Sequence, residues 1–279
     1  ATGKIGQKFI QSINDKNFKI SCLIKSRINW KDKNILSYIG NLEDKCSLKQ
    51  VPKQDIVLHM AGITHSKYSK NYISGNVKAT ENLISHFKNL NLKHFIFISS
   101  RSANKFSGAY GFSKFLAEEI IIKSKIPFSI LRLAEVYGKD MKGLSILKRV
   151  IKFPFFTFYP YPDSVKLCPV HISDVCSILN QIIISKAKDK TYIVAGPKEY
   201  SIRRLCKIIS KNYGTNNIFI PVPIFLIRIG AYLNLIFKKP IIYPDQVSRL
   251  ISEKSHDIEL LKNDFKFNPK LIEDLLEKV

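Results

Sequence analysis

A tyrosine, a lysine and several serines lie close together between His94 and Glu119 (HFIFISSRSANKFSGAYGFSKFLAEE) and could carry out acid–base chemistry. A free tyrosine titrates near pH ~10, so work as a general base at neutral pH requires its pKa to fall by roughly three units, or about 4 kcal/mol. Tyr110 and Lys114 are four residues apart, so on a helix the ammonium lies on the same face as the phenol and favours its ionised form. A serine hydroxyl could bond the substrate oxygen that exchanges the proton. The candidates for this hydroxyl are Ser99, Ser100 and Ser102. In a lysine-rich chain the same spacing also arises by chance, and Tyr110 would then only belong to the core.

The elements that would position these groups follow a strand–helix alternation. Short apolar runs at 18–24, 55–61 and 128–133, and the run that begins at His94, predict buried strands. Apolar spacing predicts helices at 3–15 and 73–90 and across the Tyr110–Lys114 segment. This alternation favours an α/β fold with a parallel, doubly wound sheet, whose ligands bind beyond the carboxyl ends of the strands. Three positions follow strands at that edge: Gly62, Ser99/Ser100 and Glu135.

The remainder of the chain predicts a second set of elements. We expect an aromatic, proline-rich loop at 153–162, a helix at 171–185 capped by Ser173 or Asp174, a strand at 191–195 and a basic helix at 201–213. The window 218–237 is the most apolar. Because prolines and Arg228 interrupt it, we interpret it as a proline-started helix that packs in a small lobe rather than as a membrane span.

A glycine-rich turn opens the chain and could hold a phosphate. Gly3 stands at the start of the first predicted helix, and Gly6 lies in its first turn. The N–H groups at the N-terminus of a helix attract anions. The turn begins as though a strand preceded it, so we expect the first strand of the sheet to be missing. After the strand at 18–24 come Lys25, Ser26 and Arg27. Basic residues there suit the 2′-phosphate of NADP, whereas an acidic residue would favour NAD, and we leave both dinucleotides open.

Composition bounds the classes of partner and site. The net charge is +23, yet the lysines are spread along the chain, so we expect a basic surface that attracts anions and no specific nucleic-acid site. Contact with nucleic acid or an anionic membrane is the weaker alternative. The five cysteines show neither a C-x-x-C pair nor a cluster with histidines. We therefore expect reduced thiols in a cytoplasmic protein and no metal site.

Several motifs, in one order, resemble the extended short-chain dehydrogenase/reductases, specifically the NAD-dependent epimerase/dehydratase group that acts on nucleotide sugars. ATGKIGQKFI resembles the T-G-x-x-G cofactor turn of this family, VLHMAG its H-x-A segment and NVKATENLI its N-V-x-G-T-x-N-L-L helix. FIFISS and YGFSK resemble its catalytic segments, LRLAEVYG its sixth-strand motif and VHISDV the segment that opens its small lobe. Short motifs that recur in a fixed order are far more specific together than singly.

The resemblance implies a role for each matching residue. Tyr110 would be the acid/base, Ser100 would bond the reacting sugar oxygen, and Lys114 would bond the nicotinamide ribose and lower the tyrosine pKa. The cofactor would also contact residues along the chain: Gly3, Gly6, Arg27, Ala61, Gly62, Asn76 and Val136. The implied reaction is hydride transfer between a sugar carbon and nicotinamide, coupled to proton transfer through Tyr110. The implied domains are a Rossmann domain at 1–165, to which the strand near 191–195 returns, and a small substrate lobe at 166–279.

The sequence departs from the family pattern at several positions and leaves the reaction open. Ser100 and Tyr110 are closer together than is usual, Glu135 replaces an asparagine near the substrate diphosphate, and Asn41 replaces an aspartate near the adenine. A UDP-hexose 4-epimerase, a dehydratase and a 4-keto-sugar reductase all fit. A non-catalytic, cofactor-binding structural or regulatory member of the same fold is the alternative. We also leave open whether two copies associate.

Overall fold

The structure is a computed structural model that describes residues 1–13, 18–28, 30, 35–141, 143–186, 189–237, 240 and 242–276. Its strands are β1 Ile20–Ile24, β2 Ile35–Ile39, β3 Ile56–His59, β4 His94–Ser100, β5 Phe128–Leu133, β6 Val136–Tyr137, β7 Phe156–Tyr161, β8 Lys166–Leu167, β9 Val170–His171, β10 Lys190–Val194, β11 Tyr200–Ser201 and β12 Ile218–Pro223. Its α-helices are α1 Lys4–Ser12, α2 Ser69–Tyr72, α3 Ala79–Phe87, α4 Gly108–Lys123, α5 Ser145–Ile151, α6 Ile172–Ile184, α7 Ile202–Tyr213, α8 Ile224–Leu233, α9 Pro244–Ile251, α10 Glu259–Asp264 and α11 Ile272–Leu275. Shorter helical segments are η1 Lys45–Leu48, the π-helical η2 Ile73–Lys78 and η3 Asn234–Ile236. None of these described helices is both long and apolar enough to cross a membrane.

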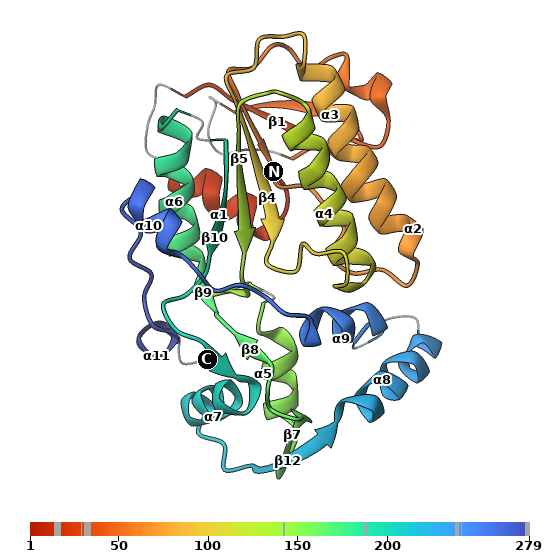
Figure 1. Cartoon of the computed structure of the whole chain (residues 1–279), viewed down its shortest axis with the longest axis vertical. Coiled ribbons are helices and arrows are strands. Elements are labelled where there is room, and N and C mark those ends of the chain that lie inside the picture. The colour runs from red at the N-terminus through yellow and green to blue at the C-terminus, as the bar shows by residue number, and fades with distance from the viewer. Residues whose placement is uncertain are drawn as a thin grey trace.

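The main sheet has four parallel strands in the order β10-β5-β4-β3, and β1 and β2 form a second parallel pair (Figure 1). In β4, Phe95, Ile96 and Phe97 are almost fully buried, because helices cover both faces of the sheet. In the register of the sheet Ser100 lies opposite Leu133, so β4 and β5 end at the same edge. The predicted α/β class with a doubly wound parallel sheet is confirmed.

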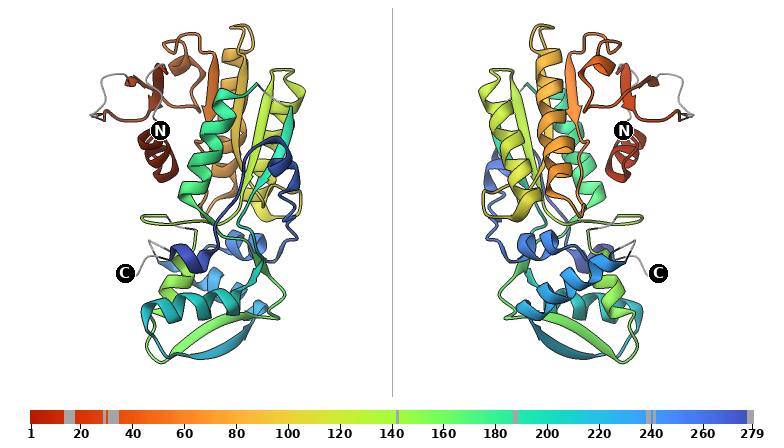
Figure 2. Two further views of the ribbon diagram at one scale, coloured as in Figure 1. Left: turned by 90° about the vertical axis from the view of Figure 1, so that its left-hand side faces the viewer. Right: turned by 90° about the vertical axis from the view of Figure 1, so that its right-hand side faces the viewer.

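Helices α3 and α4 cover one face of the main sheet, and α1, α6 and α10 lie on the other (Figures 1 and 2). On the α4 side, Ala117 and Ile121 pack on Phe95 and Ile130 of the strands. On the α6 side, the core includes side chains of α1, α6, β10 and α10, namely Phe9, Val175, Tyr192 and Leu261. Helices therefore cover both faces of the sheet, and the ends of the strands are left as the place where polar side chains can meet a ligand.

A smaller lobe lies below the carboxyl ends of the strands in Figure 1 and has a separate core. Helices α5 and α7 pack on the sheet made by β7 and β12 through Ile151, Leu205 and Ile209. Helix α6 and strand β10 come after residue 165 in the chain but pack on the main sheet, so the segments that build the two cores alternate. The domain boundary at residue 165 itself stays a prediction.

Several elements differ from the sequence-based expectation. The expected loop at 153–162 contains strand β7, and the window 218–237 begins with strand β12 before α8 starts after Pro223. Proline is tolerated in such short edge strands, because one side of each needs no N–H donor. The cap of α6 is His171, whose side chain accepts from the Ser173 backbone, and neither Ser173 nor Asp174 fills that position. In the expected first helix, Asn14 and Asp15 lie outside the described residues.

Candidate active site

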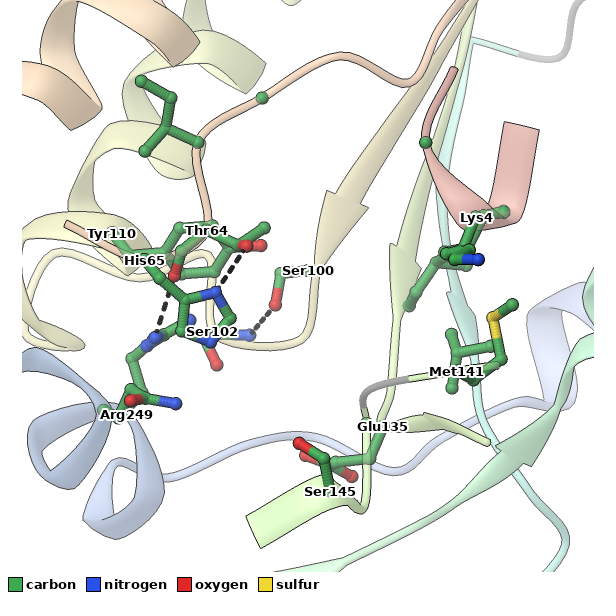
Figure 3. A pocket seen from close by; sticks show the side chains of 18 of the residues that line it. Lys4, Thr64, His65, Ser100, Ser102, Tyr110, Glu135, Met141, Ser145 and Arg249 are labelled. Atoms are coloured by element: carbon green, nitrogen blue, oxygen red, sulfur yellow. Dashed lines mark hydrogen bonds between the residues drawn. The ribbon is translucent and has the colours of Figure 1, made fainter. Parts of the chain in front are cut away.

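A cavity of about 1210 Å³ opens where the strands end, between the sheet and the small lobe (Figure 3). The sheet side contributes residues at or just beyond the carboxyl ends of β1, β2, β3, β4 and β5: Lys25, Gly40, Ala61, Ser100 and Glu135. The small-lobe side contributes Tyr159, Ile227 and Arg249. Of the predicted site residues, Gly3, Gly6, Ala61, Gly62, Ser100, Tyr110 and Val136 line this cavity. The structure therefore brings most of the predicted set together.

Glycines allow the chain to approach the cavity closely at two places. Gly3 is the N-cap of α1, and a Cβ at Gly6 would lie 2.8 Å from the Ala1 carbonyl oxygen. A Cβ at Gly62 would lie 2.7 Å from Asn76 Oδ1. The N-terminal N–H groups of α1 have no acceptor within the helix, and the helix end carries partial positive charge. We call Gly3, Gly6 and Gly62, with the N-terminus of α1, the cradle. The cradle fits a pyrophosphate, so the residues present fit a dinucleotide.

Asn76 holds the loop after β3 from outside the cavity wall. Its Oδ1 accepts from the Ile63 backbone at 2.7 Å, and its Nδ2 donates to the Ile63 carbonyl at 3.1 Å and to Ser113 Oγ at 2.8 Å. The side chain is buried and lies in the π-helical turn η2, a kind of turn frequent at functional sites. Asn76 therefore positions Ala61 and Gly62, and it is not among the residues that line the cavity.

Tyr110 lies in the cavity wall, only 8% exposed, beneath a cation from the small lobe. The Arg249 guanidinium lies 4.4 Å from the centre of the tyrosine ring, and Asp245 Oδ1 accepts from the Tyr110 backbone at 3.1 Å. Burial raises the pKa of Tyr110 above its ordinary value, although Arg249 and a hydrogen bond with Ser100 oppose the rise. The phenol is therefore protonated at neutral pH and suited to donate a proton.

Lys114 is buried one helical turn away, and its ammonium faces the sheet. Nζ donates to the Ile98 carbonyl at 2.7 Å and lies 4.1 Å from the centre of the Phe97 ring. Burial lowers the pKa of Lys114 to about 7, with Glu118 opposing this shift. The cation that opposes the rise of the Tyr110 pKa is Arg249. The predicted roles of Lys114, which are to bond the nicotinamide ribose and to lower the pKa of Tyr110, stay predictions.

The two serines that end β4 face opposite ways. Ser100 lines the cavity, and its Oγ accepts from the Ser102 backbone at 3.1 Å (Figure 3). Ser99 is buried and donates to Glu118, whose carboxylate also pairs with Arg132. The strand alternation thus leaves Ser100 for the cavity and places Ser99 in a buried ion-pair network.

After β1 the structure places Lys25, not Arg27, along the cavity. Arg27 is exposed and does not belong to the lining, whereas Lys25 pairs with Glu43 at 3.7 Å. Asn41 also lines the cavity, next to Gly40. The predicted contact of Arg27 with a cofactor stays a prediction, and the basic residue nearest to that role in the structure is Lys25.

The cations of the cavity wall that sequence reasoning missed include Arg101, Arg249 and Lys254. Arg101 follows Ser100 directly, so its place in the chain was a usable signal; the other two are more than a hundred residues from Tyr110, with no motif to mark them. The Arg101 guanidinium is buried, and the Cys168 thiol is its one weak hydrogen-bond partner among the described residues. Glu135 attracts Lys254 and accepts from the Cys168 backbone at 3.2 Å, so its charge is partly offset.

Cys168 also lies near Glu199 and His256, a grouping that the sequence did not indicate. One ligand atom from each lies within 4.8 Å of the others. Burial raises the pKa of the Cys168 thiol to about 12, and His256 Nε2 hydrogen-bonds the Gly196 carbonyl at 2.9 Å. The Cys168 thiol is therefore protonated in the metal-free chain, and His256 is held by a backbone carbonyl.

Two curated proteins share sequence with the chain. An uncharacterized membrane protein of Methanocaldococcus jannaschii is 27% identical over 59% of this chain and 56% of its own length. The mitochondrial 40 kDa subunit of NADH-ubiquinone oxidoreductase from Neurospora crassa is 20% identical over 93% of this chain and 71% of its own length. The chain thus spans just over half of the first relative.

Solved structures share the fold. A UDP-glucuronic acid 4-epimerase mutant from Bacillus cereus, solved with NAD and UDP-4-deoxy-4-fluoro-glucuronic acid, superposes with a TM-score of 0.73 at 16% identity, covering 99% of this chain and 94% of its own. At that identity the likeness concerns the fold. The family model, by contrast, matches residues 1–152 directly, which include the cradle glycines, Ser100, Tyr110 and Lys114. The chain belongs to the NAD dependent epimerase/dehydratase family.

Proposed function

We propose that this chain transfers a hydride between NAD and carbon 4 of a nucleotide-activated hexose, as a UDP-hexose 4-epimerase or a 4-keto-sugar reductase. The observation that carries the proposal is the placement of Tyr110 and Ser100 on one cavity wall with the Gly3–Gly6 and Gly62 cradle. The dinucleotide, when bound, accepts or supplies the hydride. Gly3 and Gly6 would lie under its pyrophosphate, and Ala61, Gly62 and Val136 beside its ribose and nicotinamide.

The chain's own residues supply positioning and the proton. Ser100 Oγ bonds the sugar oxygen, and the Tyr110 phenol gives or takes the proton of that oxygen. The raised pKa of Tyr110 favours the protonated phenol, which is the form that carbonyl reduction needs, and so favours the reductase direction. Arg249 would stabilise the phenolate as it forms.

The cations of the cavity wall also fit a phosphorylated substrate. Arg101 and Lys254 line the cavity together with Glu135. The attraction between Glu135 and Lys254 reduces the repulsion that a carboxylate would otherwise exert on a diphosphate. The charge of the Arg101 guanidinium remains available to an anionic group, because Arg101 takes part in none of the ion pairs among the described residues.

Turnover of UDP-hexoses with NAD, and of a UDP-4-keto-hexose with NADH, tests the proposal. Tyr110→Phe should lower kcat by roughly 10²- to 10⁴-fold because it removes the proton donor. The same variant should keep its thermal stabilisation by NADH, since the phenol oxygen is not part of the cradle. Tyr68→Phe, the same chemical change at an exposed tyrosine, is the matched control. Full activity of Tyr110→Phe would refute the assignment.

A second candidate is a dinucleotide-binding member without catalysis. It is favoured by the similarity along 93% of the chain to a protein named as a subunit of NADH-ubiquinone oxidoreductase. It is favoured also by the burial of Tyr110. This candidate expects thermal stabilisation of the wild-type chain by NADH without turnover of any UDP-hexose, whereas the enzyme expects both.

A further inference from the structure

The outer sheet of the small lobe presents aromatic side chains to solvent. Strands β7 and β12 run in parallel, with Phe156 opposite Ile218 and Phe158 opposite Ile220. Phe155, just before β7, is 75% exposed, and Phe156 and Ile218 are exposed as well. Phe153 lies against Phe158, with ring centres 6.1 Å apart. Strands β7 and β12, which carry most of these side chains, lie at the lower end of the molecule in Figure 1.

Helix α8 extends this surface. It contacts β7, β12 and α9, and Ala231 is its only buried residue. Figure 2, right, shows the helix at the front of the small lobe with no other element over it. Five large apolar side chains of the helix are exposed: Phe225, Leu226, Ile229, Tyr232 and Leu233. We call these residues, with Phe153, Phe155, Phe156 and Ile218, the apolar end. The sequence predicted a helix packed within the lobe, so this exposure is a correction.

Positive charge surrounds the apolar end. Between Glu199 and Asp245 the sequence has no Asp or Glu but seven Lys or Arg residues. On α7, Lys207 lies 6.0 Å from the centre of the Phe219 ring, beside the exposed sheet. Lys67 Nζ donates to the Leu235 and Phe237 carbonyls that follow α8. Large exposed apolar patches mark interaction sites, and this patch is bordered by cations.

The chemistry of the border selects the partner. A two-fold interface places the same surface against itself, so pairing two copies here would bring the four cations of α7 and Arg228 of both copies together, with Asp163 at the start of α7 as the acidic residue beside them. An anionic bilayer offers an apolar layer for the exposed rings and negative headgroups for the cations. Because none of the described helices can cross a membrane, the contact would lie in the interface.

We propose that the apolar end binds the surface of a bilayer with anionic headgroups, with α8 lying in the plane of the interface. Phe225, Leu226 and Leu233 enter the boundary between headgroups and acyl chains. Arg228 and the cations of α7 remain at the headgroups, as basic side chains do at interfaces. This surface is separate from Tyr110 and does not depend on the reaction proposed above.

Flotation of the purified chain with vesicles tests the proposal. We expect the chain to float with phosphatidylcholine vesicles that contain phosphatidylglycerol, and to bind vesicles of phosphatidylcholine alone much more weakly. High salt should weaken the binding, because it screens the headgroup attraction. Arg228→Glu should lower the affinity about fivefold or more, as one cation is lost and an anion gained near the surface.

Matched variants separate insertion from nonspecific stickiness. Phe225→Asp and Leu233→Asp should each weaken binding by more than about tenfold, because a charge would have to enter the apolar layer. Ile184→Asp, on α6 of the other lobe, changes an equally exposed apolar residue and should leave binding unchanged. All three should melt like the wild type, since none of the side chains is buried.

Three results would overturn the proposal. The first is no flotation of the wild type at low salt. The second is equal binding by Phe225→Asp and Ile184→Asp. The third is a dimer in sedimentation that Phe225→Asp dissociates while vesicles bind neither protein, because the apolar end would then join two copies of the chain.

Discussion

Side chains at the carboxyl edge of the main sheet are buried and hydrogen-bonded, whereas large apolar side chains at the apolar end of the small lobe are exposed. At the sheet edge, Asn76 makes three hydrogen bonds and the buried Lys114 donates to a strand carbonyl. At the apolar end, Phe225 and Leu233 are each 61% exposed. The main sheet has helices on both faces, whereas β7 turns Phe156 and Phe158 to an exposed face. Substitutions should therefore affect folding in the first region and association in the second.

Of these variants, Leu131→Ala should lower the free energy of unfolding most. A small loss would contradict the contrast between the buried sheet and the exposed apolar end. Leu131 is fully buried in β5, and its truncation leaves a cavity in the main core. We expect a loss of about 2–5 kcal/mol in the free energy of unfolding, measured by urea denaturation. A loss below about 1 kcal/mol would mean that the sheet core repacks freely.

Lys114→Met should remove the pH dependence of the unfolding free energy that the buried Lys114 amine causes. In the unfolded chain Lys114 keeps its proton up to about pH 10.5, whereas in the folded chain it releases it above about pH 7. The unfolded state binds more protons in that window, so this lysine makes stability rise with pH by up to about 1.4 kcal/mol per unit. Urea midpoints of both proteins across the window measure the slope, and equal slopes would contradict the burial of an ionisable amine.

Ser201→Ala tests whether the N-cap of α7, on the buried side of the small lobe, contributes to the stability of the chain. Ser201 caps α7 by accepting from the Arg204 backbone at 3.2 Å. Its loss should cost about 1 kcal/mol of unfolding free energy. Ser255→Ala, which lies outside any helix start, is the control. If both variants have the same stability, the cap contributes nothing.

Leu233→Ala should give the smallest effect and completes the pair with Leu131→Ala. The same atoms are removed, but from an exposed position, so the unfolding free energy should change by no more than about 0.5 kcal/mol. A loss comparable to that of Leu131→Ala would show that α8 is packed in solution, and the contrast between the two regions would disappear.

The sequence predicted the elements of the sheet better than those of the small lobe. Strand β5 was expected at 128–133 and has these bounds, because a run of apolar residues between polar ones has few alternatives in a parallel sheet. Strands β7 and β12 were missed because proline argues against a strand unless the strand lies at an edge, and edges are a tertiary property. The exposure of α8 was missed because a helix that is apolar on nearly all sides ordinarily indicates burial.

At the site, sequence order showed which motifs belong together but not how the charges face one another. Gly62, Ser100 and Glu135 line one cavity, as their positions near strand ends implied. The cation on Tyr110 was assigned to Lys114, four residues away, whereas Arg249 lies over the ring. Spacing identifies the residues that share a helix face, but a contact between residues 110 and 249 depends on how the lobes pack.

That contact sets a limit on how the chain could be shortened. On α9, Asp245 accepts a hydrogen bond from the Tyr110 backbone, and Arg249, one turn later, lies over the Tyr110 ring. Both residues lie beyond the 152 residues that the family model matches. A fragment trimmed to the matched portion would keep the glycine-rich turn and the FIFISS and YGFSK segments. It would nevertheless lose the contacts of Asp245 and Arg249 with Tyr110, so carrying these motifs and holding Tyr110 in the observed arrangement are separable properties of this chain.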